Sequence, residues 1–293
     1  MSLSVCIFAR NEERLLPNCV GALNAAGLSH DDQVYILVNG CSDNTALAAK
    51  ALASADRRIT VIELPVGDKA NAWNDYVHRI ADLRVRTHVF IDGDTKPSDG
   101  SLFALCKALA YSPASYAAAA VPIAGRSRRK WTKNLLIKHQ LSGNLYAMSS
   151  SAINAFRQKS LRLPFGAKGE DGLVAYLLLT NLKGGKDDSF NERIIAAEHA
   201  TFEFGSLNLN FRDLKIYQRR LQRYSERYFQ KQILYKLLKD YGVAAMPDTV
   251  YTIYTPETLK RLHPRLDLVN FWFDIATLRR LKRLSITQTL QPA

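Results

Sequence analysis

The chain has 293 residues, of which 47% are hydrophobic and 23% charged. This composition is typical of a packed globular protein and excludes a disordered one. A single core stops growing near about 250–300 residues, which allows one large domain or one of about 200 residues with an appendage. Lys and Arg number 40 against 27 Asp and Glu, a net charge of +13. Such a surface attracts nucleic acids, phospholipid head groups or phosphorylated small molecules, although a merely solvated surface explains the same composition.

The positive charge is concentrated in two regions. Residues 205–293 hold 16 Lys and Arg against 7 Asp and Glu, so 9 of the 13 net charges lie in the last third. This excess predicts association with an anionic surface or acceptor, with a solvated packing surface as the alternative. The second region is a cluster without an acid between its ends: Arg126, Arg128, Arg129, Lys130, Lys133 and Lys138.

The four cysteines and the N-terminus indicate the compartment. Cys6, Cys19, Cys41 and Cys106 form no CxxC pair, which argues against a zinc site. Their scatter is typical of reduced thiols in a cytosolic protein. The sequence has neither a signal-peptide pattern nor an apolar stretch long enough to cross a bilayer. We therefore expect a cytoplasmic protein, peripheral at the inner face of the membrane if it associates with one.

The first half of the chain alternates between apolar runs and helical patterns. Short continuous apolar runs predict strands buried on both faces, and apolar residues at spacings of three and four predict helices between them. Such alternation is typical of βαβ units with a mostly parallel sheet. The expected strands are 4–9, 33–38, 59–64 and 87–91, and the expected helices are 12–26, 44–54, 70–83 and 98–110.

The second half is less regular. We expect strands at 116–123 and 194–204, an extended piece at 143–149, and a loop or helix start in the basic stretch 125–138. Helices are expected at 172–180 and 209–239, followed by a helical tail over 244–293. The change of pattern divides the chain into a catalytic domain, 1–205, and a basic helical extension, 206–293.

Ligands of such sheets bind beyond the carboxyl ends of the strands, here the loops 10–12, 39–43 and 92–94. Asp92-Gly93-Asp94 follows an apolar run, and two carboxylates on one turn can face a hard divalent cation. Mg²⁺ or Mn²⁺ held there would neutralise a departing diphosphate. The alternative is a solvated turn, because Asp-Gly-Asp is common in turns.

Five segments in order give the chain a resemblance to the family-2 glycosyltransferases, which have the GT-A fold, a Rossmann-like, mostly parallel sheet flanked by helices. The resemblance covers roughly residues 3–205 and includes the family's Asn-Glu turn, DxD motif and ED motif. The matching segments are VCIFARNEE at 5–13, VNGCSDNT at 38–45, GDKANAWN at 67–74, FIDGD at 90–94 and GED at 169–171.

The resemblance implies a donor site for a nucleotide sugar. Ala9, Asn11 and Glu12 would line the base and ribose pocket, and Lys69 would lie near the nucleotide. The second loop departs from the family, because Asn39 stands near the position of an Asp that pairs with the nucleobase. Asn can still donate and accept hydrogen bonds, so Asn39 remains a candidate donor-binding residue.

The resemblance also implies the metal and the catalytic groups. Asp94 would bind Mg²⁺ or Mn²⁺ together with Asp92, which would contact ribose or phosphate. Asp171 would be the general base of an inverting transfer, and Glu170 would orient the acceptor. The alternative is that Glu170 and Asp171 only stabilise a helix N-terminus. A late histidine, His199, is a weaker metal candidate.

The basic helix at 209–239 contains QRRLQRY at 218–224, which faintly resembles a Q-x-x-R-W motif of processive family members. Arg219 and Arg220 are therefore expected near phosphate, although Tyr224 replaces the usual Trp and an amphipathic packing helix is the alternative. Among the tryptophans, Trp131 is the best candidate for an acceptor contact, whereas Trp73 and Trp272 either stack on sugar or fill the core.

The expected function is a metal-dependent, inverting glycosyltransferase that moves a sugar from a nucleotide-sugar donor to an acceptor hydroxyl, with a glycan or lipid-linked acceptor in envelope or polysaccharide synthesis. One alternative is a nucleotidyltransferase, but residues 4–13 lack the glycines of its phosphate loop. An inactive nucleotide-sugar-binding scaffold is another. No nucleic-acid partner is expected, because neither an RNA-recognition signature nor zinc-finger spacing is present.

Overall fold

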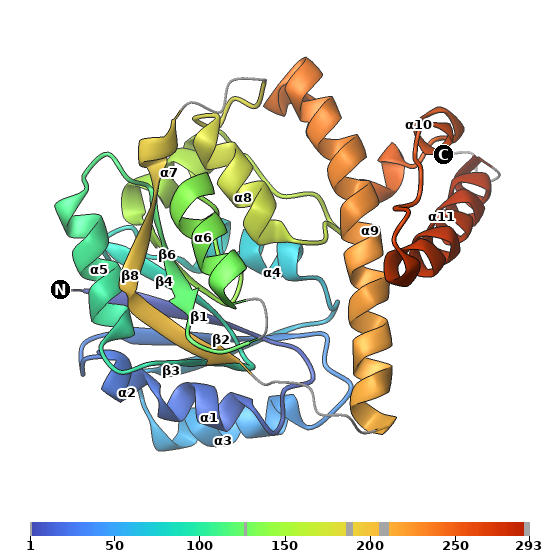
Figure 1. Cartoon of the computed structure of the whole chain (residues 1–293). Helices are drawn as coiled ribbons and strands as arrows, with labels where there is room; N and C mark the ends of the chain where they lie inside the picture. Colours follow the sequence, from blue (N-terminus) through green and yellow to red (C-terminus); the bar gives the residue numbers. More distant parts are fainter. Residues whose placement is uncertain (1, 126–127, 186–189, 205–210, 290–293) are drawn as a thin grey trace.

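A computed structural model describes residues 2–125, 128–185, 190–204 and 211–289. One twisted sheet carries helices on both faces, and a long helix, α9, runs along one side of this body with further C-terminal helices beyond it (Figure 1). The expected α/β class with a mostly parallel sheet flanked by helices is confirmed.

The sheet has eight strands in the described part of the chain, in the order β3-β2-β1-β4-β7-β6-β8-β5. Strands β1, β2, β3 and β4 pair in parallel, as do β6 and β8. Strand β7 is antiparallel to both β4 and β6, and β5 is antiparallel to β8. The bounds are β1 Leu3–Ala9, β2 Gln33–Asn39, β3 Ile59–Leu64, β4 Thr87–Asp92, β5 Thr95–Pro97, β6 Ala117–Pro122, β7 Leu145–Ser149 and β8 Ile194–Phe204.

The central strands are buried on both faces, which is why they are continuous apolar runs in the sequence. In β1, Val5 and Ile7 point into one core, and Cys6 and Phe8 point into the other. The first core is covered by four helices: α1 Leu16–Gly21, α2 Leu23–Ala26, α3 Thr45–Ala55 and α5 Ser101–Tyr111.

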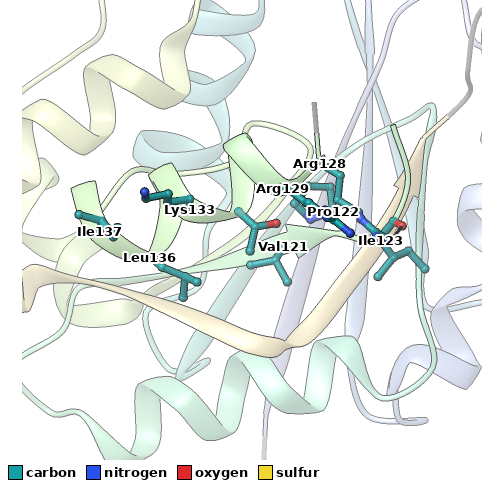
Figure 2. A pocket seen from close by; sticks show the side chains of 9 residues that line it. Val121, Pro122, Ile123, Arg128, Arg129, Lys133, Leu136 and Ile137 are labelled. Atoms are coloured by element: carbon teal, nitrogen blue, oxygen red, sulfur yellow. Dashed lines mark hydrogen bonds between the residues drawn. The ribbon is translucent and has the colours of Figure 1, made fainter. Parts of the chain in front are cut away.

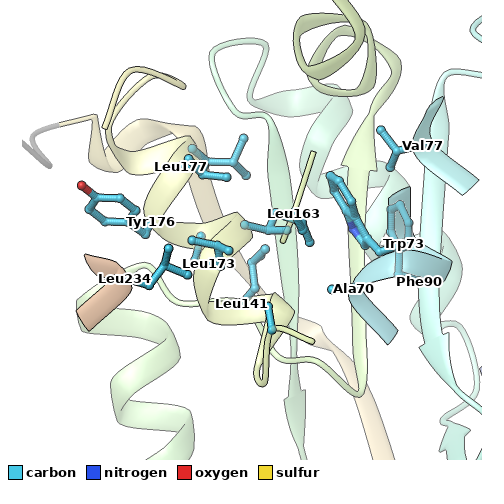
Figure 3. Close-up of a cluster of buried hydrophobic side chains, with 14 of the residues drawn as sticks. Ala70, Trp73, Val77, Phe90, Leu141, Leu163, Leu173, Tyr176, Leu177 and Leu234 are labelled. Carbon is cyan, nitrogen blue, oxygen red and sulfur yellow. The ribbon is translucent and has the colours of Figure 1, made fainter. Parts of the chain in front are cut away.

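The second core lies between the sheet and helices α4 Lys69–Asp75, α6 Arg128–Lys138, α7 Ser150–Gln158 and α8 Glu170–Leu179. Figure 3 shows Trp73 beside Phe90 in this core, with Leu163, Leu173 and Leu177 at its other side. Because Trp73 is fully buried, it fills the core and does not contact a sugar.

Several expected bounds need correction. The helix expected at 12–26 begins only at Leu16, because Glu12 forms a turn, and it divides at Ala22 into α1 and α2. The helix expected at 70–83 becomes a π-helical turn, Tyr76–Ile80, and ends there. The basic stretch forms helix α6, and α7 was not expected at all.

The C-terminal region is helical, as expected. It contains α9 Phe211–Tyr241, α10 Pro256–Lys260 and α11 Leu268–Thr289, with 3-10 turns at Val243–Ala245 and Val250–Ile253. A further 3-10 turn, Asn191–Arg193, precedes β8. Helix α9 buries Phe229, Leu234 and Leu238 in the core that α8 shares, so α9 packs directly on the body formed by the sheet and its flanking helices. The expected domain boundary at 205–206 lies outside the described residues, and the division into 1–205 and 206–293 stays a prediction.

All four cysteines are free thiols, and Cys6, Cys19 and Cys106 are buried. In the described part of the chain, none of the helices is sufficiently long and apolar to span a membrane.

Candidate active site

The Asp92-Gly93-Asp94 turn is held against the carboxyl end of β1. The Asp92 backbone N–H donates to the Asn144 carbonyl at 3.0 Å, and the Gly93 N–H donates to the Phe8 carbonyl at 2.9 Å. A Cβ on Gly93 would lie 3.2 Å from that carbonyl oxygen and 3.3 Å from the Ala9 Cα, so glycine permits the close approach. The turn therefore carries its two carboxylates to the edge of the sheet beside buried Ala9.

Lys69 connects three parts of this edge. Its Nζ pairs with Asp92 Oδ1, lies 2.7 Å from Glu170 Oε1, and donates to the Gly143 carbonyl at 3.2 Å. Burial lowers the pKa of Lys69, but the Asp92 and Glu170 carboxylates outweigh burial and raise it above the ordinary value. Lys69 thus stays charged and joins the end of β4 to the start of α8.

Asp68 fixes the start of α4 and with it the position of Lys69. Its Oδ1 accepts from the Asn71 N–H at 2.7 Å, and its Oδ2 accepts from the Gly166 N–H at 2.9 Å. The Asp68 N–H donates to Asn39 Oδ1 at 3.0 Å. Asn39 is buried, so this side-chain oxygen is engaged within the protein.

Negative charge accumulates in front of these strands. The pKa of Glu12 is raised to about 8, mainly by burial and then by the charges of Asp94, Asp92 and Asp43, whereas Arg220 lowers it. Burial also raises the pKa of Asp92 to about 7, against the lowering effect of Lys69. Glu12 and Asp92 are thus acids whose ionisation is disfavoured, and a cation beside them would be stabilised.

Asp171 lies in the first turn of α8, where a negative charge is favoured. Its Oδ1 accepts from Arg227 Nη2 of α9 at 3.0 Å, and its carboxyl carbon is 3.2 Å from where a Cβ on Gly143 would lie. Gly169 precedes the helix with φ +80°, and a Cβ there would lie 2.1 Å from Arg227 Nε. Glycine at this position therefore gives Arg227 access to Asp171.

The structure brings together most of the expected residues. Asp92, Lys69 and Glu170 are in contact, and Glu12 lies within electrostatic reach of Asp94 and Arg220. Asn11 has a left-handed backbone, φ 59°, which lets its side-chain oxygen accept from the Ser42 N–H at 2.8 Å.

Other candidate residues lie outside this network, either exposed on the surface or packed against other side chains. Arg219 is exposed on α9, and His199 is exposed on β8. Trp131 packs edge-on against Phe202 and Phe204, with ring centroids 5.8 Å apart in both pairs.

Within the described residues, no group of three or more His, Cys, Asp or Glu side chains is arranged to hold a metal by itself. The residues nevertheless fit a hard divalent cation. Asp92 and Asp94 supply oxygen ligands, and Mg²⁺ commonly binds through one or two carboxylates with substrate phosphates and water completing its shell. The donor set is therefore suited to a metal that arrives with a diphosphate.

Sequence analysis missed three residues of the network. Arg227 lies seven residues beyond Arg220, two helical turns along α9, and this spacing was the only available signal. Asp68 stands in a matched segment but received no role. Asn144 accepts from Asp92 through its carbonyl and donates from Nδ2 to Thr95 Oγ1 at 2.9 Å, contacts that no local pattern indicates.

Solved structures share this fold. A mannosyltransferase from Pyrobaculum calidifontis, in complex with GDP-Man and Mn²⁺, is 16% identical with a TM-score of 0.60, covering 98% of this chain and 87% of that chain. A truncated TarS from S. aureus, in complex with UDP-GlcNAc, is 11% identical with a TM-score of 0.52, covering 99% and 92%. A longer TarS chain is matched over 55% of its length.

Glucosyl-3-phosphoglycerate synthase from Mycobacterium tuberculosis, with Mn²⁺, UDP-glucose and phosphoglyceric acid, is 19% identical with a TM-score of 0.50, covering 76% of this chain and 79% of that chain. The fold is therefore that of the GT-A glycosyltransferases. The sequence profile of the family described as Glycosyl transferase family 2 matches residues 4–166, more than half of the chain. The chain belongs to this family and is a glycosyltransferase. No curated protein matches it in sequence.

Proposed function

We propose that this protein transfers a sugar from a nucleotide-sugar donor to an acceptor hydroxyl, with a divalent metal and with inversion at the anomeric carbon. The observation that carries the proposal is the acidic edge of the sheet, where Glu12 is partly buried and lies near enough to Asp94, Asp92 and Asp43 for their charges to raise its pKa. These residues lie at the carboxyl end of β4 and in the turns and loops that follow β1, β2 and β4, at the edge where ligands of α/β sheets bind.

Asp94 and Asp92 would hold the metal, Mg²⁺ or Mn²⁺. Asp92 also pairs with Lys69, whereas Asp94 makes no ion pair with any described residue. Asp94 is therefore the carboxylate that a metal would engage at the least cost. When bound, the metal would neutralise charge on the donor diphosphate. Two solved neighbours contain Mn²⁺ with a nucleotide sugar, which supports the same assignment here.

Asp171 would take the proton of the acceptor hydroxyl. Its carboxylate is mostly buried at the start of α8 and is paired with Arg227, so its orientation is fixed. A base in this position serves a single displacement, which inverts the configuration. Glu170, one residue earlier, pairs with Lys69 and would orient the acceptor from the same turn.

The donor would lie along the carboxyl ends of β1, β2 and β4. Ala9 ends β1, Asn11 and Glu12 begin the loop after it, and these residues would line the base and ribose pocket. Asn39, whose side-chain oxygen accepts from the Asp68 N–H, would offer the donor only its amide nitrogen. Lys69 would face the phosphates. Arg220 is close enough to Glu12 to affect its pKa and would approach the phosphates from α9, with Arg219 beside it.

The acceptor would be a glycan or a lipid-linked compound, with peripheral association at the anionic inner face of a membrane. The basic excess of residues 205–293 supports this, and so does an exposed apolar surface where α11 begins. This surface comprises Leu266, Leu268, Val269 and Trp272, whose exposed fractions are 91%, 87%, 52% and 71%. Aromatic and aliphatic side chains beside basic residues are typical of proteins that lie on anionic bilayers.

A screen of nucleotide sugars by thermal shift, with and without Mn²⁺, tests the donor assignment. We expect one nucleotide sugar to raise the melting temperature, and more so with Mn²⁺, because ligands that bind only the folded state stabilise it. Stabilisation by nucleoside triphosphates alone would favour a nucleotidyltransferase. Metal-independent binding without any turnover would favour an inactive nucleotide-sugar-binding protein.

A further inference from the structure

A cavity of about 460 Å³ lies between α6 and the end of β6, and none of the residues given a role above lines it. Figure 2 shows Val121, Pro122 and Ile123 on the strand side and Leu136 and Ile137 on the helix side. Val121 and Pro122 are buried, whereas Ile123, Leu136 and Ile137 are exposed apolar side chains. The cavity is therefore an open apolar surface in water, which is unfavourable unless a ligand covers it.

Three cations stand over this apolar surface: Arg128, Arg129 and Lys133 of α6. No acid lines the cavity, and none of the three pairs with an acid in the described residues. Arg128 Nη1 donates to the Ile123 carbonyl at 2.8 Å, which holds its guanidinium at the carboxyl end of β6. The charge in the cavity is thus uncompensated and partly fixed in place, which favours an anionic ligand.

The charged and apolar side chains of α6 are distributed unevenly along the cavity, with Lys133 between the two ends (Figure 2). The two arginines stand at the first residues of the helix, and Leu136 and Ile137 stand near its last residue, Lys138. Nine residues of helix separate Arg128 from Ile137, a span of about 13 Å. A ligand that satisfies both ends has an anionic head and an apolar chain of comparable length.

The cationic end faces the edge that carries the acidic turn. Pro122 of β6 and Pro97 of β5 are both paired with Phe202 of β8, so two strand spacings, about 10 Å, separate them. Asp94 directly precedes β5, and β6 runs in the same direction as β4. A head group at Arg128 and Arg129 would therefore lie on the same edge as Asp94, with its chain directed away along α6.

We propose that this cavity binds an amphipathic phosphate, the phosphate at Arg128 and Arg129 and the apolar chain against Val121, Leu136 and Ile137. The proposal rests on the transferase function above and assigns to its acceptor a phosphate and a lipid-like chain. Adjacent guanidinium groups present forked donors that match phosphate oxygens. A glycan fits less well, because Thr132 is the only neutral polar side chain of the lining and sugars need several such partners. The occupant is a single ligand molecule and not a bilayer surface.

Calorimetric titration with decyl phosphate, kept below its micelle concentration and without donor, tests the proposal. Decanol and inorganic phosphate serve as the half-ligands, and both should bind at least tenfold more weakly than decyl phosphate. Arg129→Ala should weaken binding about tenfold, the loss of one charge-assisted contact. Ile137→Ser should weaken decyl phosphate but not inorganic phosphate. Lys130→Ala is the matched control, because Lys130 is exposed on the same helix outside the cavity lining, and it should bind normally.

Failure of the cavity proposal can be distinguished from failure of the transferase proposal, because the thermal shift with donor and Mn²⁺ is recorded on the same preparations. Absence of decyl phosphate binding in protein that still responds to donor would overturn the cavity assignment alone. Equal affinity for decyl phosphate and inorganic phosphate would overturn the apolar half. Binding only to anionic vesicles, or equal weakening by Lys130→Ala, would assign the charge to a membrane surface and overturn the proposal.

Discussion

Asp171, the proposed base, lies outside the ion-pair network of the residues proposed to bind the donor. It lies beside Gly143 and is paired with Arg227, whereas Lys69, Asp92 and Glu170 form a separate ion-pair network one residue away. Substitution of Asp171 therefore leaves the Lys69 network intact. This separation makes Asp171 the clearest test of the proposed base.

We expect Asp171→Asn to reduce transfer about 10²–10⁴-fold, because asparagine keeps the shape of the side chain and loses its basicity. Donor affinity, measured by calorimetry with Mn²⁺, should change little. Ser151→Ala, a substitution at an exposed position of α7, is the control for effects of preparing a variant. A rate near that of the unmodified enzyme, or retention of anomeric configuration in the product, would contradict the assignment.

At the scale of elements, α9 completes the site from outside the matched family segments. Arg227 pairs with Asp171, and the charge of Asp171 is the main factor that raises the pKa of Arg227. Because Arg227 is partly exposed, the pair contributes little to stability, at most about 1 kcal/mol. The proposed effect of Arg227 is to hold the Asp171 carboxylate in its orientation.

Arg227→Ala is therefore expected to lower kcat about tenfold or more while the donor Kd and the melting temperature change little. Arg227→Lys should recover part of the rate, since it restores the charge without the fork. Arg223→Ala, an exposed arginine one turn away on α9, is the matched control. Equal losses for Arg223→Ala and Arg227→Ala would show that the helix contributes only general positive charge.

Strand β4 contains a buried histidine that makes stability depend on pH. Burial, and then the charge of Arg157, lower the pKa of His88 from 6.5 to about 4, and its Nδ1 lies 3.0 Å from the Tyr76 hydroxyl. Below about pH 6.5 the unfolded chain takes up a proton that the folded chain refuses. The free energy of unfolding should therefore fall between pH 6.5 and 4, by on the order of 3 kcal/mol from this group.

Urea unfolding at several pH values measures this slope. His88→Gln, which cannot titrate, should flatten the decline between pH 6.5 and 4 even if it lowers stability at every pH. His263→Gln, an exposed histidine, is the control and should leave the slope unchanged. An unchanged slope in His88→Gln would contradict the assignment of the pH dependence to His88.

The strands and helices could be predicted only in part from a single sequence. The four parallel strands were predictable because strands buried on both faces are continuous apolar runs. The direction of β7 was not, because it depends on partners such as Phe90, which pairs with Tyr146 far along the chain. Strand β5 has only three residues and no periodicity. Helix α7 begins at a Ser149 cap, but its three buried apolar residues are too few for a clear pattern.

The candidate site was predictable to a similar degree. Residues at strand ends, such as Asp92 and Asp94, are indicated by their position after an apolar run. Arg227 resembles every other arginine of a basic helix, and only its contact with Asp171, 56 residues away, distinguishes it. The pairing of Lys69 with Glu170 likewise depends on the fold and has no local signal.

At the scale of the whole molecule, the exposed apolar surface at the start of α11 predicts how the protein meets a membrane. Leu268 and Trp272 are one helical turn apart and largely exposed. Electrostatic attraction adds about 1 kcal/mol per basic residue near anionic lipid and is screened by salt. Flotation with anionic vesicles should therefore show binding at low salt and release as salt rises.

The double variant Leu268→Ser, Trp272→Ser should bind vesicles several-fold more weakly, because it removes the side chains that would enter the interface. Leu47→Ser is the matched control, since Leu47 is 66% exposed on α3, one of the helices that cover the sheet. If the unmodified protein fails to float with anionic vesicles at low ionic strength, this surface packs against a partner chain or stays in solvent.

In the proposed reaction, the acidic edge of the sheet binds a metal together with a nucleotide diphosphate and uses both for sugar transfer. Release of nucleoside diphosphate from the donor found in the screen, with Mn²⁺ or with EDTA, measures this directly. We expect release with Mn²⁺ and none with EDTA. We also expect Asp94→Ala to abolish release. The melting temperature of this variant should be unchanged, because Asp94 pairs with no described cation. Full activity of Asp94→Ala in EDTA would contradict the account.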